Sequence, residues 1–464
     1  MNIDMLRNVS SRKNITSKSK LRSLIFFDMD FTQAFTYIKR TMKKLKLLNL
    51  LPSFLRVALI RRNIKILTSP EGFQVNIAST QEELEKAYKL LHDCYAGIGL
   101  MDHDPSGLRC NFYSFLPYTT TVVAKIGGVV VGTVSLIKDS PAGLPSDKDF
   151  KNENDELRLK GHRLVEVSSL AIDKSFRNRS HVVSLFLMKY LQHYTTHFMG
   201  CTTVSCVIHP RAKDFYRAIW GFSANKRIIE YKFVNNALGI HTYGKITDEA
   251  LLNLQSKFPI SPEKNPIKFC LSDEKCLIYP ERKIQHHLDP VYTPELLSYF
   301  MSERTDTVKK LSQSELVTIF CAYSLFFDNL EVLEVFKDLD QSTFKKRSFR
   351  FFARAEARLT DKNGNLIEAY ISDISPKGVF LATKDFATLD GDYTIEFVLG
   401  ENSFKIPGRI KWQNRRIRNN NRIGFGFEFN QPHLDIARIL KQTHLSRRQT
   451  TAVTNTDQRL KRAD

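Results

Sequence analysis

Long apolar runs are missing from this sequence, and so are paired cysteines. No uncharged apolar stretch approaches the roughly 20 residues that a helix needs to span a bilayer. The apolar stretch SLIFF near the N-terminus stops at Asp28, so it is too short for the core of a secretory signal. The seven cysteines are scattered without a CxxC pair or a metal-type spacing, which argues against a disulfide framework. These absences predict a cytoplasmic protein.

Acidic residues are scarce relative to basic ones. The chain has 69 Lys and Arg but only 49 Asp and Glu, a formal net charge of +20 at pH 7. This balance predicts anionic partners, such as nucleotides, membrane phosphates or acidic carrier proteins. A DNA- or RNA-reading motif is also missing, and the basic residues gather in the leader and the tail rather than on one recognition helix. We therefore do not expect nucleic-acid binding.

Residues 1–64 form a basic leader in which leucines mix with cations, as in YIKRTMKKLKLLNLLPSFLRVALIRR. The mixture suits short amphipathic helices, and two interpretations stay open. One is attachment to an anionic membrane or carrier, which implies a peripheral position at the inner membrane surface. The other is a helix pair that packs on the next domain and leaves its lysines in solvent.

Strand and helix patterns alternate between residues 65 and 246. Apolar residues have helical spacing in EELEKAYKLLHDCYA, and TTTVVAKIGGVVVGTVSLIKD reads as two strands joined by a hairpin turn at Gly127–Gly128. RLVEVSSLAI reads as a strand followed by a helix, and CTTVSCVIH as a strand followed by a short helix that ends at Gly221. This order predicts an α/β domain built on a mixed sheet with flanking helices.

Two further patterns follow toward the C-terminus. Residues 247–344 read as a mostly helical connector, with capping signatures at the starts of TPELLSYF and SQSELVTIF. Residues 345–440 read as short strands with a hairpin turn at Asn363–Gly364, which is typical of a small all-β barrel. Residues 441–464 are polar and basic, and they predict a disordered tail.

Two arginines four residues apart, Arg350 and Arg354, stand just before the first strand of that barrel, and DISPKG follows at Asp373–Gly378. With Trp412 and the closing strand RIGFGFEF, these RxxxR and DxSxxG patterns make the region resemble a PilZ domain along its whole length. The resemblance implies that cyclic di-GMP, a bacterial second messenger, is bound by Arg350, Arg354, Asp373, Ser375 and Gly378.

These residue types suit that ligand. Arginine presents a planar fork of donors that fits phosphate oxygens and the Hoogsteen edge of guanine. Asp373 and Ser375 can accept from and donate to guanine, and Gly378 lets the backbone turn tightly beside the base. The alternative is a basic surface stretch, because each motif alone is common by chance. Many family members carry an arginine where this chain has Phe349, and the basic residues at 346 and 347 are candidate substitutes.

The region 65–246 resembles the GNAT acyltransferase superfamily, and most closely its N-acyl amino acid synthase branch. The resemblance is carried by LLHDCYAGIGLMD, GLR at 107–109, the hairpin described above with the LPYT and PAGLP that flank it, RLVEVSSLAID and IHPRAKDFYRAIWGF. EVSSLAI is also similar to a strand of the acyl-homoserine lactone synthases. The resemblance implies transfer of a fatty acyl chain from the phosphopantetheine of an acyl carrier protein to the amine of an amino acid, and we expect no metal ion.

Such chemistry needs a group that removes a proton from the ammonium of the attacking molecule. Glu166 alternates with Val165 and Val167 in a strand expected to be buried, where a carboxylate is costly without a task or a partner. We interpret Glu166 as the general base, acting directly or through water; the alternative is a structural glutamate with satisfied hydrogen bonds. The resemblance places Tyr216 as general acid, with core packing as the alternative. Arg109 is a candidate partner for the carboxylate of the acceptor.

The strand that carries Glu166 leads into the turn DKSFRNRSH. In GNAT enzymes the helix after such a turn holds a phosphate of the donor at its N-terminus. The resemblance places the acyl donor beside Leu170, Ile172, Arg177, Arg179 and Ser180. The usual glycines are missing, which disfavours tight coenzyme A binding and is compatible with the single phosphate of a carrier protein. The alternative is a basic helix cap.

We therefore predict a cyclic di-GMP-responsive N-acyltransferase in which the helical connector couples ligand binding to access of the acyl pocket. The rival is a catalytically inactive GNAT fold that serves as a cyclic di-GMP receptor and acts through protein–protein contacts. The glycine-free turn favours the rival, whereas Glu166 and the HPRAKDFYRAIWGF segment favour the enzyme.

Overall fold

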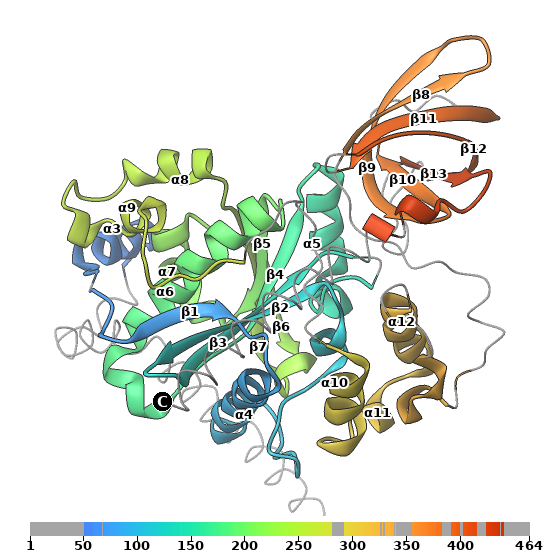
Figure 1. The fold of residues 1–464 in the computed structure, drawn as a ribbon. Helices are drawn as coiled ribbons and strands as arrows, with labels where there is room; N and C mark the ends of the chain where they lie inside the picture. The colour runs from blue at the N-terminus through green and yellow to red at the C-terminus, as the bar shows by residue number, and fades with distance from the viewer. Residues whose placement is uncertain are drawn as a thin grey trace, which may run out of the picture.

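The structure is a computed structural model that describes residues 51–439, except 67, 141, 281–291, 325–326, 328–329, 338, 340–354, 383–390, 400–401, 415–423 and 437. The described chain forms a seven-stranded mixed sheet with helices on both faces and a separate closed six-stranded barrel (Figure 1). The predicted fold class, an α/β sheet with flanking helices plus a small all-β barrel, is confirmed. Within the described part of the chain, none of the helices has the length and apolar character that a bilayer crossing requires.

The sheet has the strand order β1-β2-β3-β4-β5-β7-β6. Its strands are β1 (Phe73–Ile77), β2 (Thr119–Ile126), β3 (Val129–Lys138), β4 (Leu164–Ile172), β5 (Thr203–Ile208), β6 (Ser223–Tyr231) and β7 (Ala237–Lys245). Only β4 and β5 pair in parallel; the other neighbours are antiparallel. The turn between β2 and β3 confirms the hairpin predicted at Gly127–Gly128, where both residues have the positive φ that glycine tolerates.

One face of the sheet is covered by helices that share a single hydrophobic cluster. These helices are α3 (Ser53–Asn63), α6 (Ser180–His193), α7 (Lys213–Trp220), α8 (Asp248–Gln255) and α9 (Pro266–Leu271). The α6 helix continues as one π-helical turn, Tyr194–Phe198. The apolar side chains of α6, such as Phe186 and Leu187, fill the space above β1, β2 and β3.

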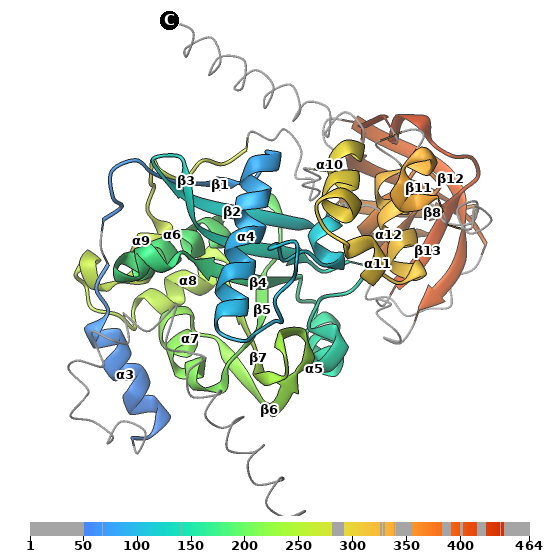
Figure 2. The same cartoon turned by 90° about the horizontal axis from the view of Figure 1, so that it is seen from below.

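The opposite face carries a second hydrophobic cluster. Its helices are α4 (Gln81–Gly97), α5 (Asp147–Leu159), α10 (Pro294–Ser298), α11 (Thr307–Lys310) and α12 (Gln313–Tyr323), with the π-helical turn Tyr299–Glu303 between α10 and α11. Figure 2 shows α4 lying across the strands. The capping signatures predicted for α10 and α12 are present, because Thr293 and Ser312 accept hydrogen bonds from the backbone of the first turn.

The segment predicted as a helical connector packs closely on the sheet in its described parts. Its first part, through α8 and α9, belongs to the cluster beside α6. Its second part joins the cluster beside α4, where Tyr292 and Phe300 contact the rings of Phe115 and Tyr88. These contacts do not test the boundaries proposed at residues 246 and 344, which stay predictions.

The leader prediction falls mostly on residues outside the described range. Its described end, α3, packs against α7. Arg56 Nε lies 2.6 Å from Asp214 Oδ2, and Ser53 Oγ donates to Asp214 Oδ1 at 2.5 Å. Arg61 Nε also donates to the carbonyl oxygen of Ala218 at 3.0 Å, so this helix uses two of its arginines within the fold.

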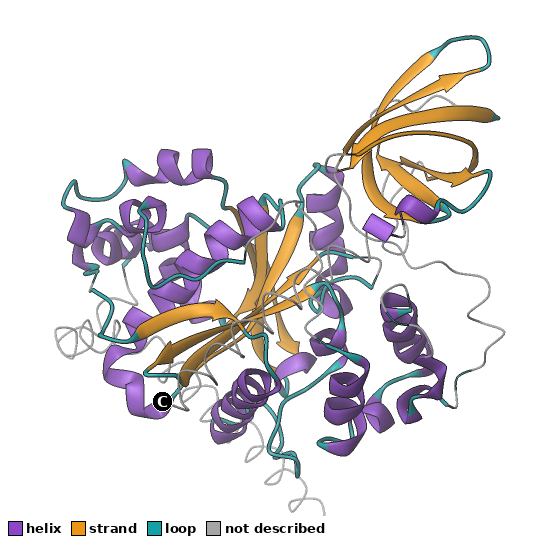
Figure 3. Cartoon of the chain, in the orientation of Figure 1, coloured by secondary structure: helices purple, strands orange, loops and turns teal. Residues whose placement is uncertain are grey.

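The barrel has its own core, made of side chains from all six strands. Its strand order is β10-β13-β12-β11-β8-β9, closed and antiparallel throughout. Figure 3 shows this unit built mainly of strands, in contrast to the sheet domain with its many helices. The strands are β8 (Ala355–Asp361), β9 (Leu366–Ser375), β10 (Gly378–Ala382), β11 (Asp392–Leu399), β12 (Asn402–Asn414) and β13 (Gly424–Phe429). The hairpin predicted at Asn363–Gly364 joins β8 to β9.

Candidate functional site

The centre of the sheet opens between its two parallel strands. Pairing of β4 with β5 runs from Leu164–Thr203 to Glu166–Ser205 and stops there. Beyond this point β4 is irregular, since its register with β3 shifts between Thr133 and Ser135, and Ser169 has a φ of 57°. A left-handed conformation at a non-glycine residue is strained and is often found at functional sites. The divergence of the strands leaves main-chain groups of β4 unpaired with β5.

A cavity of about 160 Å³ occupies this opening. Residues 166–170 of β4 form one wall, and the opposite wall is provided by 206–208 at the end of β5. Met188, Leu191, Trp220, Phe222 and Ile246 line it from the α6 and α7 side, and Tyr95 and Phe233 from the side of α4. Because its walls come from both faces, the cavity passes through the layer of the sheet.

Glu166 lies at the last position of β4 that pairs with β5, lines the cavity and is only 2% exposed. Its Oε2 accepts a hydrogen bond from the backbone N–H of Ser146 at 3.0 Å and another from Ser146 Oγ at 2.7 Å. Burial raises the pKa of Glu166 to about 7, and the two Ser146 bonds oppose this rise. A carboxyl group with that pKa can both take and return a proton near neutral pH.

Tyr216 and Leu170 line the same cavity as Glu166. The Tyr216 ring stacks on Phe222 with centroids 6.0 Å apart, and burial raises the pKa of its hydroxyl far above the usual value. This hydroxyl therefore keeps its proton at working pH, as a proton donor must. Ile172 differs from Leu170, because it packs in the core beside α6 and is not part of the cavity lining.

The predicted donor-phosphate turn lies at the end of β4. It forms a short 3₁₀ helix, Lys174–Arg179, followed directly by α6 at Ser180. The side chains of Arg177, Arg179 and Ser180 lie outside what the structure describes. The helix start and the cavity wall are thus consecutive in the chain, separated by one short turn.

Arg109 is a buried cation next to the cavity. It is 9% exposed, and its guanidinium lies 4.4 Å from the Tyr95 ring and 5.2 Å from the Phe233 ring, both of which line the cavity. It donates one hydrogen bond, from Nη2 to the carbonyl oxygen of Phe233 at 3.2 Å. Among the described residues, no carboxylate forms an ion pair with it. Burial accordingly lowers the pKa of Arg109 from its usual value.

Sequence reasoning missed the groups that surround Glu166 from the other side. Ser146, Asn154, Ser205 and His241 are all fully buried and joined by hydrogen bonds. Asn154 follows Phe150 by one helical turn in α5. An asparagine at helical spacing from an apolar residue in a charged helix was the sequence signal that could have indicated a buried polar group here. No comparable signal marks Ser205 or His241, because their proximity depends on the pairing of β5 with β7.

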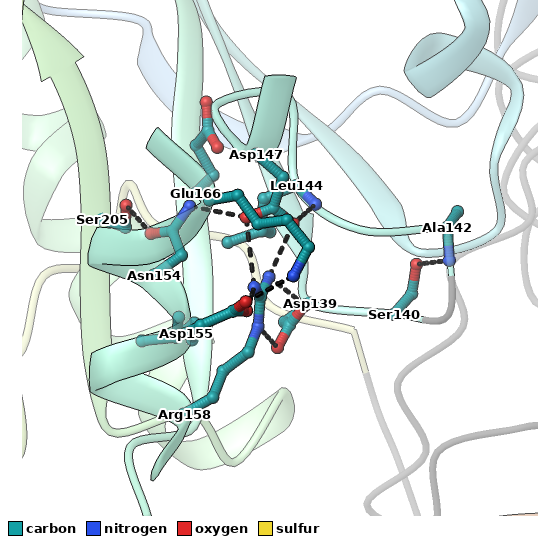
Figure 4. Close-up of polar contacts among 12 residues, drawn as sticks. Asp139, Ser140, Ala142, Leu144, Asp147, Asn154, Asp155, Arg158, Glu166 and Ser205 are labelled. Carbon is teal, nitrogen blue, oxygen red and sulfur yellow. Dashed lines mark hydrogen bonds and ion pairs between the residues drawn. The ribbon is translucent and has the colours of Figure 1, made fainter. Parts of the chain in front are cut away.

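A four-residue ion cluster fixes α5 over these groups (Figure 4). Arg158 pairs with Asp139 through two hydrogen bonds of 2.9 Å and with Asp147 and Asp155 at 2.7 Å each. Because Arg158 is mostly shielded from solvent and hydrogen-bonded to all three carboxylates, the cluster holds the 139–147 segment and α5 together. Ser146, which donates to Glu166, lies at the N-terminus of this helix.

The barrel places its predicted ligand residues at one turn. Ser375 and Gly378 pair across the turn between β9 and β10, with Ser375 Oγ donating to the carbonyl oxygen of Gly378 at 3.2 Å. A Cβ atom at Gly378 would lie 2.2 Å from the carbonyl oxygen of Phe427, so glycine is required for close packing on β13. Asp373 is also buried in β9. Arg350 and Arg354 lie outside the described residues.

A row of paired residues that includes two aromatic side chains runs from Asp373 across four neighbouring strands of the barrel, β9, β10, β13 and β12. Asp373 pairs with Phe380, Phe380 with Gly426, and Gly426 with Trp412 on successive strands. The indole of Trp412 stacks on Phe380 with centroids 5.4 Å apart, and it can lie there because a Cβ at Gly426 would meet its Nε1 at 2.4 Å. Trp412 keeps half of its surface exposed, whereas Phe380 is only 4% exposed, so the indole of Trp412 provides the planar face on the row that starts at Asp373.

Two family models match this chain. Residues 86–242 match N-acyl amino acid synthase FeeM, and residues 344–443 match the PilZ domain. The first match spans Arg109, Glu166 and Tyr216, and the second includes both motif arginines and the β9–β10 turn. No curated protein matches the chain by sequence.

Several solved structures are similar to the first of these regions. FeeM, an N-acyl amino acid synthase from uncultured soil microbes, is 26% identical, with 40% of this chain and 94% of that one covered and a TM-score of 0.33. The acyl-homoserine lactone synthase LasI is 16% identical, with 41% and 98% covered and a TM-score of 0.31. The coenzyme A-dependent synthase BjaI is 17% identical, with 43% and 97% covered and a TM-score of 0.29.

The family matches agree with the two architectures described above, a mixed sheet that opens between parallel strands and a closed antiparallel barrel. They confirm the two resemblances found in the sequence and the predicted enzyme class. The chain therefore contains a GNAT-like N-acyl amino acid synthase domain of the FeeM type, which is an acyltransferase domain, together with a C-terminal PilZ domain.

Proposed function

We propose that this protein transfers a fatty acyl group from an acyl carrier protein to the amine of an amino acid or similar small amine, with Glu166 as general base. The observation that carries the proposal is the position of Glu166. A buried carboxyl group with a pKa raised to about 7 lines an apolar cavity at the point where two strands separate. A structural glutamate held by the Ser146 hydrogen bonds has no need to line a cavity, whereas a base there gains access to substrate.

The reaction requires the ammonium of the acceptor to lose a proton to Glu166, directly or through one water. The freed amine attacks the thioester carbonyl carbon, a C–N bond forms, and the C–S bond breaks as the tetrahedral intermediate collapses. The leaving thiolate takes a proton from Tyr216, and the nitrogen gives up its second proton, which returns the tyrosine to its neutral form. The products are an amide and the free thiol of the carrier.

The donor fits the opening between β4 and β5. The backbone of residues 167–170, unpaired with β5, offers hydrogen-bonding groups to the pantetheine amides. The apolar walls on the α6 and α7 side suit the acyl chain. The α6 N-terminus follows within one turn, where its free N–H groups favour a phosphate. The absence of glycine from DKSFRNRSH supports a carrier-protein donor rather than coenzyme A.

The acceptor fits the opposite mouth of the cavity, where Arg109 is held between Tyr95 and Phe233. A buried guanidinium without a carboxylate partner among the described residues would gain a strong, charge-assisted pair from the carboxylate of an amino acid. That anchor would direct the amine of the acceptor toward Glu166 and Tyr216, which line the same cavity.

The PilZ domain supports binding of cyclic di-GMP at the β9–β10 turn, with Asp373 and Ser375 toward guanine and Arg350 and Arg354 as phosphate partners. The exposed indole of Trp412, on the row that starts at Asp373, offers a surface for a base. We propose that this binding regulates the acyltransferase. In support, the connector holds the loop that leads to Arg109: Arg304 Nε lies 2.7 Å from Glu85 Oε1, and Arg304 Nη1 donates to the carbonyl of Ser106 at 2.7 Å.

Mass spectrometry with purified full chain tests the enzyme directly. The reaction contains carrier protein loaded with mixed long-chain acyl groups and a pool of amino acids, and a parallel reaction contains the same chains on coenzyme A. We expect an N-acyl product with the carrier, formed faster as pH rises through about 7 because Glu166 must lose its proton to act. Glu166→Gln should reduce kcat by about 10²–10⁴.

The matched control is Glu230→Gln, which changes an exposed glutamate on β6 and should leave kcat unchanged. No product in either reaction, from a folded protein that binds cyclic di-GMP, would favour the rival interpretation of a non-catalytic receptor. Full activity in Glu166→Gln would remove Glu166 from the role of base.

A further inference from the structure

Behind Glu166, on the side away from the cavity, a chain of buried polar groups continues from Ser146. Asn154 Nδ2 donates to Ser146 Oγ at 2.9 Å, and Asn154 Oδ1 lies 3.0 Å from His241 Nε2. Asn225 Nδ2 lies 2.9 Å from His241 Nδ1 at the outer end. Ser146, Asn154 and His241 are completely buried, so the contacts among them are made out of reach of solvent, while the Asn225 contact at the outer end is partly buried.

The hydrogen bonds of this chain run from Asn225 toward Glu166, and Asn154 Nδ2 is shared with Asp147 Oδ1 at 2.8 Å. Asn225 Nδ2 can only donate, so His241 Nδ1 accepts and its Nε2 carries the hydrogen. Burial lowers the pKa of His241 to about 4, which keeps the ring neutral. The Nε2–H then lies between Asn154 Oδ1 at 3.0 Å and Ser205 Oγ at 2.9 Å, and Ser205 Oγ itself donates to Asn154 Oδ1. Both donors face Oδ1, which turns the amide so that Nδ2 donates to Ser146. With its lone pair engaged by Asn154, the hydroxyl of Ser146 gives its hydrogen to Glu166 Oε2.

The two oxygens of Glu166 consequently differ. Oε2 accepts from the backbone N–H of Ser146, a group that can never accept a proton in return, and also from the hydroxyl. Hydrogen bonds from the described residues end on Oε2, while Glu166 itself lines the cavity. A proton added to this carboxylate at Oε2 would face two donors, so Oε1 is the favourable position for it.

We propose that Ser146, Asn154 and His241 are positioning residues that hold Oε2 as an acceptor and reserve Oε1 for the proton of the acceptor amine. The inference depends on the proposed role of Glu166 as base and adds the reason for its orientation. None of the three touches substrate; they act through the carboxylate. The family match names none of these roles, and they follow from the direction of the hydrogen bonds.

Other groups face Glu166 from the elements around it. They are Asp147 and Arg158 of α5, Tyr113 of the 3₁₀ turn Phe112–Phe115, Cys206 of β5 and Tyr231 of β6. His241 of β7 reaches Glu166 only through Asn154 and Ser146. Burial raises the pKa values of the tyrosines and the cysteine, so these groups stay neutral. Asp147 raises the pKa of Glu166 and Arg158 lowers it, both less than Ser146 does. Removing the Ser146 hydroxyl should therefore raise this pKa.

The pH dependence of kcat in Ser146→Ala tests the proposal. Loss of one hydrogen bond to the carboxylate should move the acidic limb up by about one pH unit, with roughly fivefold lower kcat at pH 7 that recovers at pH 9. KM for donor and acceptor should change little. His241→Leu should shift the acidic limb of kcat in the same direction. His241→Gln keeps an N–H donor toward Asn154, so its acidic limb should stay at the wild-type position.

An infrared titration provides a reading that needs no turnover, because the protonated-carboxyl band that disappears in Glu166→Gln reports the pKa of Glu166 directly. The control is Thr195→Val, which removes a buried hydroxyl with no hydrogen-bond partner among the described residues and should leave the limb in place. Folded Ser146→Ala with an unmoved limb and band would overturn the positioning role and reduce Ser146 to an anchor of α5. An active Glu166→Gln would instead overturn the base assignment, so the two failures are distinguishable.

Discussion

At the scale of single residues, the site depends on the carboxyl group of Glu166, which is buried although water would solvate its charged form better. Burial raises the pKa of Glu166, and two hydrogen bonds from Ser146 keep the rise moderate. Ionising the folded protein at this position costs free energy. If Glu166 is the base that we propose, stability is given up for a group that titrates near neutral pH, an exchange common at catalytic sites.

This exchange predicts a pH-dependent gain in the stability of Glu166→Gln. The folded pKa of Glu166 is about 7 and its ordinary value is 4.5. Below pH 4.5 the carboxyl group is protonated in both the folded and unfolded states, and between 4.5 and 7 only the unfolded state releases the proton. Wild-type stability thus falls across this window, by at most roughly 3 kcal/mol from this group. Glutamine does not titrate and escapes the loss.

Urea unfolding at pH 4.5 and at pH 8 measures the difference. The free energy of unfolding of Glu166→Gln relative to wild type should be higher at pH 8 than at pH 4.5, and Glu230→Gln should show no such change. An equal difference at both pH values would mean that Glu166 has an ordinary pKa in the folded protein.

At the scale of elements, the important contacts are those between the connector and the loop that precedes Arg109. Arg304 pairs with Glu85 of α4 and with the carbonyl of Ser106, while Lys310 Nζ lies 2.5 Å from Asp104 Oδ2. The contacts of Arg304 with Ser106 and of Lys310 with Asp104 join the connector, which precedes the barrel in the chain, to the loop that precedes Arg109. Motion of the connector would therefore displace the loop that carries Arg109.

Arg304→Met tests this link. Arg304 and Glu85 are each about one third exposed, so loss of the pair should cost stability only about 1 kcal/mol or less. KM for the acceptor should rise several-fold, while kcat stays near the wild-type value because Glu166 is not touched. Arg109→Gln removes the arginine that we propose binds the carboxylate of the acceptor, and its KM shows the largest rise to expect when that contact is lost. Lys309→Met, which breaks an exposed pair with Asp306 at the start of α11, is the control. An unchanged KM in Arg304→Met would separate the connector from the acceptor site.

At the scale of the whole molecule, the barrel and the sheet have separate hydrophobic cores. A ligand that binds only the barrel stabilises that unit directly, and it reaches the acyltransferase only through the residues between them. The described part of the chain thus predicts two stability transitions rather than one.

Cyclic di-GMP should raise the barrel transition in calorimetry of the full chain. At a hundredfold excess over Kd the gain is about 2.7 kcal/mol. Arg350→Ala and Asp373→Asn should abolish the shift. If the ligand is coupled to catalysis, saturating nucleotide also changes kcat or KM of the acyl transfer or hydrogen exchange within residues 65–246. A shifted barrel transition with identical kinetics and exchange would sink the regulatory proposal and leave the binding site intact.

Some of the fold was predictable because its signals are local. The glycine pair between β2 and β3, the Asn363–Gly364 turn and the caps at Thr293 and Ser312 depend on residues close in sequence. The helix α5 was not anticipated, because it is highly charged and its buried stripe includes a polar residue, Asn154. Its stability comes from tertiary contacts such as those of Arg158.

Four features could be predicted from the sequence alone. They are the alternation of strands and helices, a barrel after residue 345, the RxxxR and DxSxxG motifs, and Glu166 as a candidate base. These follow from periodicity, turn residues and an acidic side chain in an apolar strand. Only the tertiary structure decided that Glu166, Tyr216 and Leu170 share one cavity and that Ser146 and His241 stand behind the carboxylate. Burial and hydrogen-bond direction depend on which strands become neighbours. Residues that are tens of positions apart in the sequence carry no local signal that they will meet in the fold.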